Sequence, residues 1–158
     1  GCGWLAASVL ASSVGTADAQ VRAWYGVLAG TQTNNTSGVR SVDLVTGAPG
    51  PKVTLGAQAN DIVLSPDGRR VYAARFDATA QDGLRVIDAA TSQLVASVPI
   101  RFPLGLGVSP DGAKVYVAAA GGVNVVATAT HTITRVITGL QDARNIAVSA
   151  DGRWGYAP

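Results

Sequence analysis

Three aspartates recur with the same neighbours, and they are the first residues in the sequence that suggest chemistry. Asp67, Asp111 and Asp151 each stand two residues after a serine, directly before a glycine and five residues before a tyrosine. A carboxylate beside a hydroxyl, with a basic residue two or three positions further on, could act as a general acid or base. The copies are 44 and 40 residues apart, however, and a catalytic acid is not needed in every repeat. Repetition therefore favours a structural role.

The repeated stretch has the composition of a tight turn. Pro66 and Pro110 preset φ at the second turn position, the aspartate can bond the local backbone, and the following glycine accepts a positive φ. In the third copy Ala150 replaces the proline, which loosens the turn without forbidding it. We therefore predict three hairpin turns, with a catalytic role as the alternative.

A second unit recurs between these turns. The stretches GVRSVDLVTGA, GLRVIDAATSQ and GVNVVATATHT begin at Gly38, Gly83 and Gly122. In each, an alternating apolar segment ends in Asp or Ala and is followed by a short polar turn and a further apolar segment. Asp43 and Asp88, which end two of these segments, are predicted to cap the next turn, with a metal or acid–base role as the alternative.

Each repeat therefore has four short strands and no helix. Composition agrees, because all ten acidic residues are Asp and the chain has 19 Gly, which suits turns better than helix surfaces. Four strands in about 40–45 residues are typical of a β-propeller blade, and roughly four to eight blades close a propeller. The sequence predicts an all-β, incomplete β-propeller of about three and a half antiparallel blades, with boundaries near 20–57, 58–100, 101–140 and 141–158. Tyr72, Tyr116 and Tyr156 are predicted to pack between blades.

The first 19 residues predict a signal peptide that is truncated at its start. WLAASVLASSV is an eleven-residue, largely apolar run that is too short to span a bilayer, and Ala17-Asp18-Ala19 is an A-x-A cleavage pattern. The alternatives are an apolar N-terminal strand or helix and a lipid anchor at Cys2. The chain contains no Met, which together with the open propeller faces predicts a fragment at both ends. A mature chain from Gln20 would have no cysteine and so no disulfide.

The repeats resemble the YVTN-repeat β-propeller family of bacterial and archaeal exported or surface proteins. The matching stretches are SPDGRRVYAA with LRVIDAAT and SPDGAKVYVAA with VNVVATAT, and the likeness covers about residues 26–158. Arg75 and Ala119 replace the family's closing Asn, and Ala127 replaces its Asp. The resemblance implies a propeller and an exported protein (periplasmic, cell-surface or secreted). It carries over no catalytic residue.

Loop lengths indicate where a site would lie. From the aligned tyrosine to the next strand, the chain takes 14, 12 and 7 residues in successive units. From the end of that strand (Asp43, Asp88 or Ala127) to the serine of the next turn it takes 22, 21 and 22 residues. The variable loop joins strands two and three, on the same face as the connectors between blades. Variable loops on a rigid scaffold usually carry function.

The predicted ligand contacts lie on this face. They are Asn60, Asp61, Arg101, Phe102, Arg144 and Asn145 on the connectors, and Asn34, Asn35, Arg75, Asp77 and Asp82 on the variable loops. Arg101 and Arg144, placed at matching positions of successive blades, would line a channel mouth and attract an anion. The alternative is that they are solvated loop residues.

No catalytic motif accompanies these residues, and we predict no catalytic residue, metal ligand or cofactor. His131, the single His, is expected as an exposed turn residue, with a haem or metal ligand as the alternative. A scattered net charge of +2 argues against nucleic acid.

We expect a non-catalytic, exported binding or interaction scaffold with no membrane span in the mature chain. Its expected partners are an unidentified protein or small anionic ligand and the remaining blades of its own chain. One alternative is a lactonase-type propeller enzyme, whose opening the stretch GTQTNNTSGVRSVDLVTGA resembles. Another is a propeller subunit that partners a haem or quinone redox protein.

Overall fold

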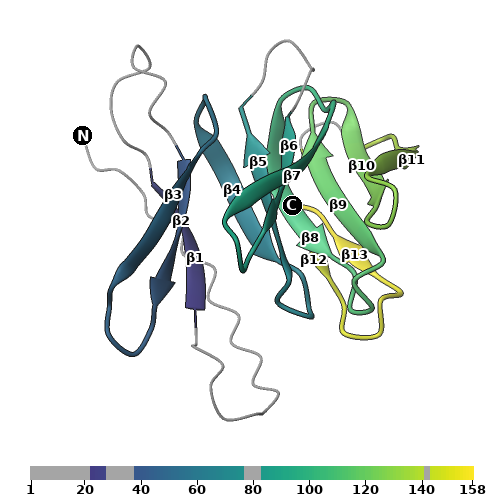
Figure 1. The fold of residues 1–158 in the computed structure, drawn as a ribbon. Coiled ribbons are helices and arrows are strands. Elements are labelled where there is room, and N and C mark those ends of the chain that lie inside the picture. Colours follow the sequence, from purple (N-terminus) through teal and green to yellow (C-terminus); the bar gives the residue numbers. More distant parts are fainter. Residues whose placement is uncertain (1–21, 28–37, 77–82, 141–142) are drawn as a thin grey trace.

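A computed structural model describes residues 22–27, 38–76, 83–140 and 143–158 (Figure 1). The first sheet has the strand order β1 (Arg22–Val27), β2 (Gly38–Asp43), β3 (Pro49–Thr54). The second contains β4 (Ala59–Leu64), β5 (Arg70–Arg75), β6 (Leu84–Asp88) and β7 (Gln93–Val98). The third contains β8 (Pro103–Val108), β9 (Lys114–Ala119), β10 (Gly122–Ala127) and β11 (Thr132–Ile137). A last pair is formed by β12 (Ala147–Val148) and β13 (Gly155–Tyr156).

All strand neighbours are antiparallel and consecutive along the chain. The prediction of an all-β chain with four-stranded antiparallel sheets is therefore confirmed for the described residues. The strand positions agree with the repeats, because each alternating segment forms a strand and each polar stretch between them turns the chain.

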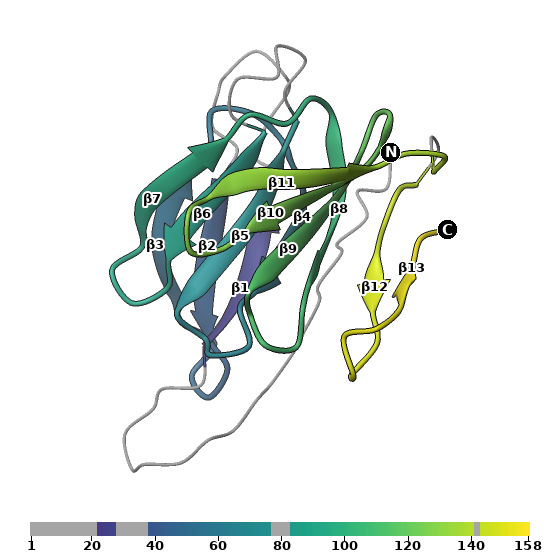
Figure 2. The same ribbon diagram turned by 90° about the vertical axis from the view of Figure 1, so that its right-hand side faces the viewer.

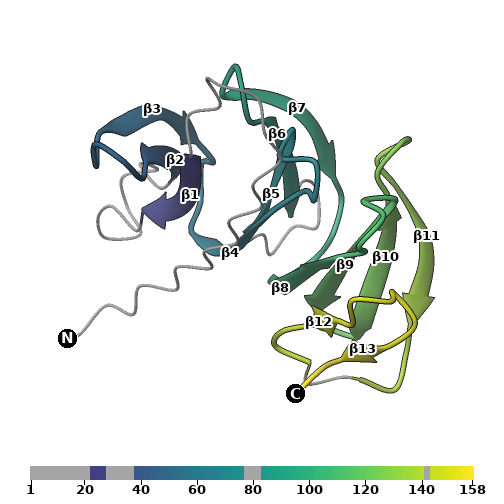
Figure 3. The same ribbon diagram turned by 90° about the horizontal axis from the view of Figure 1, so that it is seen from below.

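The sheets stand side by side with their sequence-first strands turned to the same side. β4 contacts both β1 and β8, and β8 also contacts β12. The last strands β3, β7 and β11 lie along the outer edge (Figure 3). The β12–β13 hairpin stands beside the β8–β11 sheet (Figure 2). The β3–β4 and β7–β8 connectors leave from one end of the sheets, and the tight turns from the other (Figure 1).

Apolar side chains fill the contacts between neighbouring sheets. The second and third sheets share the largest cluster, in which Leu84, Val86 and Val115 are completely buried. The first and second sheets share another around Val39, Val71 and Ile87. These clusters hold the sheets together, because each strand directs its apolar residues alternately to the two flanking sheets.

Hydrogen bonding at the three repeated turns confirms the structural interpretation of their aspartates. In each turn a carboxylate oxygen accepts the serine hydroxyl and the backbone N–H two residues on, from Arg69, Ala113 and Arg153 respectively. The glycines that follow have φ of 71°, 71° and 70°. These carboxylates thus stabilise the hairpin turns.

The same bonds predict how acid affects stability. Serine hydroxyls above all, and then backbone N–H groups, hold the pKa of Asp67, Asp111 and Asp151 below the ordinary value of 3.8. A lowered folded-state pKa gives stability that is present above pH 3.8 and is lost as pH falls through the folded pKa. We expect the melting temperature of a triple Asp→Asn variant to fall less than that of the parent between about pH 5 and about pH 2. If the melting temperatures of the parent and the variant fall equally with pH, the three carboxylates do not stabilise the turns as described.

The other two repeated aspartates also act as predicted. Asp43 Oδ1 accepts the N–H groups of Val45 and Thr46, at 2.8 and 2.9 Å. Asp88 Oδ1 accepts those of Ala90 and Thr91, at 3.1 and 2.9 Å. Asp88 also pairs with Arg70 on the neighbouring strand β5. Both carboxylates cap the turn that follows their strand.

The prediction that the three repeated tyrosines pack between neighbouring sheets does not hold for all of them. Tyr72 is 3% exposed within the cluster between the second and third sheets. Tyr116 is half-buried against a further apolar cluster that contains Val123 and Ile146. Tyr156 is 63% exposed, so the prediction of interblade packing is wrong at this residue within the described structure.

Several predictions lie outside the described residues. These are the signal peptide at 1–19 and the loop residues Asn34, Asn35, Asp77 and Asp82. Among the residues that are described, no helix has the length and apolar character needed to cross a membrane.

Candidate functional site

Asn60 and Asp61 lie in β4 and bind the neighbouring sheet. The Asn60 amide nitrogen donates to the Pro103 carbonyl at 2.7 Å. Asp61 Oδ1 accepts the N–H of Ile62 at 2.7 Å, and its Oδ2 accepts that of Leu106 in β8 at 2.8 Å. Burial raises the pKa of Asp61, and the two N–H groups oppose that rise. Both predicted residues thus join β4 to the β8 segment.

Beside them, the connector from β7 to β8 carries an aromatic and cationic cluster. The Phe102 ring lies 5.5 Å from the Phe76 ring, between centroids and tilted by 48°. The Arg101 guanidinium carbon lies 5.0 Å from the Phe102 centroid, within the range of a cation–π contact. Arg101 is exposed, Phe76 is 47% exposed, and Phe102 is half-buried. The cluster therefore presents both a cation and an aromatic surface to solvent.

Phe102 has an unusual backbone for a bulky residue. Its φ is 48°, in the left-handed region that glycine usually occupies. Such a conformation persists only where surrounding contacts hold it, and it is often found at binding sites. Here it places the Phe102 ring between Arg101 and Phe76.

Arg75 ends β5 next to this cluster. Its backbone N–H donates to the Gly83 carbonyl at 2.7 Å, and the next residue, Phe76, donates to the Gln58 carbonyl at 2.7 Å. Arg75 is half-buried. The structure therefore brings five predicted residues to the same end of β4, β5 and β8: Asn60, Asp61, Arg75, Arg101 and Phe102.

Arg144 and Asn145 precede β12, and both are exposed. Asn145 Oδ1 accepts the N–H of Ile146 at 2.7 Å, as Asp61 does from Ile62. Their backbone packs on Gly105, where an added Cβ would lie 2.5 Å from Asn145 Cα. The predicted equivalence of Arg101 and Arg144 is wrong, because Leu104 is the residue five before its turn serine, as Arg144 is before Ser149.

A cavity of about 490 Å³ lies along the innermost strands. Its walls come from β4, β8 and β12 and include Asp61, Leu106 and Asn145. Two predicted residues, Asp61 and Asn145, line it.

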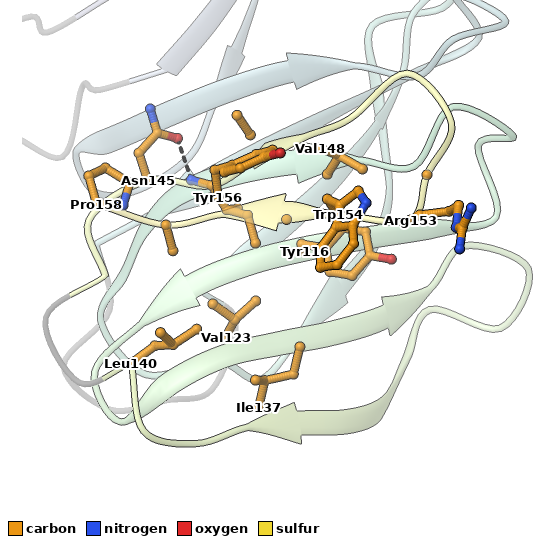
Figure 4. Close-up of a pocket in the computed structure, with 15 residues that line it drawn as sticks. Tyr116, Val123, Ile137, Leu140, Asn145, Val148, Arg153, Trp154, Tyr156 and Pro158 are labelled. Carbon is orange, nitrogen blue, oxygen red and sulfur yellow. Dashed lines mark hydrogen bonds between the residues drawn. The ribbon is translucent and has the colours of Figure 1, made fainter.

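A larger cavity of about 930 Å³ separates the β12–β13 hairpin from the outer strands of the third sheet (Figure 4). Val123 and Ile137 line it from β10 and β11, and Trp154, Tyr156 and Pro158 line it from the hairpin side. Asn145 borders both cavities. The wall is largely apolar and has no acid–base pair of the kind that hydrolysis would need.

Phe76 and the close packing at Gly105 were not predicted from the sequence. Phe76 and Phe102 are the two phenylalanines of the chain, and that pairing was the available signal. His131 lies in the β10–β11 turn, as predicted, with φ of 55°, but it is half-buried and not exposed. Within the ranges that the structure describes, no three His, Cys, Asp or Glu side chains gather as metal ligands.

No protein-family model matches the sequence, and no curated protein matches it. A chain of hydrazine synthase from Kuenenia stuttgartiensis is similar in structure, with a TM-score of 0.69 and 26% identity over 80% of this chain and 36% of that chain. An auxiliary nutrient binding protein from Bacteroides ovatus has a TM-score of 0.64 and 18% identity, over 78% of this chain and 31% of its own. This chain spans about a third of the length of each. The second likeness shows the fold alone.

Proposed function

We propose that the sheets are successive blades of a β-propeller, of which this chain forms about three and a half. The support is geometric. Each full sheet has four antiparallel strands, the first strands β4 and β8 contact each other, and the last strands lie on the outer edge (Figure 3). An exported chain, related to the YVTN-repeat propellers, agrees with the leader pattern and repeat motif of the sequence.

The proposed role of this scaffold is non-catalytic binding on the connector face. The observation that carries this role is the cluster of Arg101, Phe102 and Phe76, held at one end of the sheets by the strained Phe102 backbone. An exposed guanidinium and two phenyl rings suit a ligand with a carboxylate and an apolar body. The N–H groups of Ile62 and Leu106, which donate to the two Asp61 oxygens, offset part of the repulsion between Asp61 and such a ligand.

A titration with benzoate tests this role. In a two-dimensional amide NMR spectrum of the whole chain, we expect benzoate to shift the backbone N–H signals of Phe76, Arg101, Phe102, Leu104 and Gly105. Arg101→Gln should weaken this binding about tenfold, because it removes the charge-assisted contact. Arg153→Gln, on the turn face, serves as the matched control and should leave the affinity unchanged. Shifts confined to the turn face, or an affinity that Arg101→Gln leaves intact, would overturn the proposal.

One observation favours a second candidate, the redox-partner propeller. The 26% identical structure belongs to a protein named hydrazine synthase, although this chain spans only 36% of that chain. The discriminating observation is the full open reading frame: a C-x-x-C-H haem-attachment segment favours the redox role.

A further inference from the structure

The strands β4 and β8, which come first in their sheets, each have one edge outside the sheet ladders. Among the described strands, β4 pairs only with β5 and β8 only with β9. The opposite edge of each therefore carries backbone N–H groups that no strand accepts. Ile62 and Leu106, each three residues before the serine of its turn, supply two of these groups. Both donate to one side chain, that of Asp61.

The two N–H groups meet the Asp61 carboxylate as they would meet a bound anion. Oδ1 accepts the Ile62 N–H at 2.7 Å, and Oδ2 accepts the Leu106 N–H at 2.8 Å, so each oxygen has its own donor. These lengths are typical of charge-assisted bonds to a carboxylate. Backbone N–H groups from two different sheets thus converge on one carboxylate, which is the arrangement of a backbone anion site.

The repeat shows that a carboxylate is not required at this position of the strand. The residues that stand four before the turn serine are Asp61, Gly105 and Asn145. Gly105 has no side chain, and Asn145 Oδ1 accepts the N–H of the next residue, Ile146, at 2.7 Å (Figure 4). Among the side-chain bonds described for these three positions, only those of Asp61 join two sheets.

A cavity gives a small ion access to this point. The cavity of about 490 Å³ along β4, β8 and β12 is lined by Asp61, Ile62 and Leu106 themselves. Asp61 is half-buried, and burial raises the pKa of its carboxyl, so holding a charge here has a cost that the two N–H groups offset. An external anion of similar size fits the same place once the Asp61 carboxylate is removed.

We propose that the Ile62 and Leu106 N–H groups form an anion site between β4 and β8, and that the Asp61 carboxylate occupies it. The ligand class is a small carboxylate such as formate, whose two oxygens have the same spacing as those of Asp61. While Asp61 is present, its charge closes this site to external anions and leaves carboxylate ligands to the Arg101 cluster. In this last respect the inference rests on the proposed function; the anion site itself does not.

Replacement of Asp61 by the residue that β8 has at the same position tests this inference. In Asp61→Gly both N–H groups are freed at the cavity wall, and we expect formate to shift the Ile62 and Leu106 amide NMR signals in a saturable way. The melting temperature of this variant should rise by about 3 °C between zero and about 0.5 M formate, because a ligand that binds only the folded chain stabilises it. The parent should change by less than about 1 °C, through salt alone, with its Leu106 signal unmoved.

Two further variants separate the anion site from a general effect of the substitution. Asp61→Asn fills the same space without the charge, so formate should leave its Leu106 signal unmoved. Asp61→Ala frees the same two N–H groups on a less flexible backbone, and it should respond to formate as Asp61→Gly does. It also provides the measurement if Asp61→Gly folds poorly.

Either of two results overturns the inference. One is a Leu106 signal that formate leaves unmoved in both Asp61→Gly and Asp61→Ala. The other is a formate response in the parent or in Asp61→Asn that equals the response of Asp61→Gly. Because Asp61→Gly combined with Arg101→Gln should keep its formate response, this inference and the proposed benzoate site can fail separately.

Discussion

Gly105→Ala is expected to separate the β12–β13 hairpin from the third sheet and to lower stability by about 3 kcal/mol. The added Cβ would lie 2.5 Å from Asn145 Cα and 2.6 Å from the Arg144 carbonyl oxygen. Both are backbone atoms, so no side-chain rotation can relieve the clash and the segment before β12 must move. Chemical denaturation should show the loss, and hydrogen exchange should speed up at Ile146 and through β12.

Gly155→Ala is the matched control, since Gly155 belongs to the same contact. The nearest atom to an added Cβ there is Ile146 Cδ1 at 3.5 Å, an ordinary van der Waals distance. Stability should be unchanged or slightly higher, because alanine restricts the unfolded chain more than glycine does. If Gly105→Ala and Gly155→Ala lower the free energy of unfolding equally, close packing at Gly105 is not what holds β12 against β8.

Asp61→Ala is expected to lower stability by about 2 kcal/mol by weakening the contact between the second and third sheets. It leaves the Leu106 and Ile62 N–H groups without the carboxylate that accepts them. The substitution also removes the free-energy cost of burying the charged carboxylate, a cost that is evident because burial raises the pKa of Asp61. This gain offsets part of the loss of stability. A raised folded-state pKa makes the Asp61 contribution largest at low pH and smaller as pH rises through that pKa, opposite to the turn aspartates.

Asn145→Ala provides the comparison for this second prediction. The Asn145 side chain accepts only the N–H of the next residue among the bonds described for it, so its removal should cost about 1 kcal/mol or less. Thermal melts of both variants across the acid range measure the difference. Equal losses, or an Asp61 effect that does not change with pH, would contradict the role assigned to the carboxylate between sheets.

The strands and turns could be predicted from sequence because their causes are local. Alternation with a period of two sets which residues face a neighbouring sheet, and Ser-x-Asp-Gly supplies a hairpin turn without help from distant residues. Asp43 and Asp88 were predictable as caps for the same reason. Their bonds reach only two or three residues along the chain.

The misses at Asp61, Phe76 and Tyr156 depend on residues far apart in the chain. Whether Asp61 faces solvent or the Leu106 N–H depends on how two sheets meet, 45 residues apart. The contact of Phe76 with Phe102 depends likewise on strand register and on one left-handed residue. Tyr156 shares its motif with Tyr72, but burial requires a neighbouring sheet, which the repeat motif does not specify.

The radial arrangement of the sheets is most directly tested by two distances measured with pulsed electron paramagnetic resonance. Cys2 is the single cysteine, so a Cys2→Ser background allows spin labels to be placed at chosen pairs. Arg69 and Ala113 lie on the inner turns of the second and third sheets, and Ala90 and Ala129 lie on the corresponding outer turns; all four are exposed. Propeller blades predict a clearly longer distance for the Ala90–Ala129 pair than for the Arg69–Ala113 pair. Equal distances, as in sheets stacked in parallel, would contradict the account.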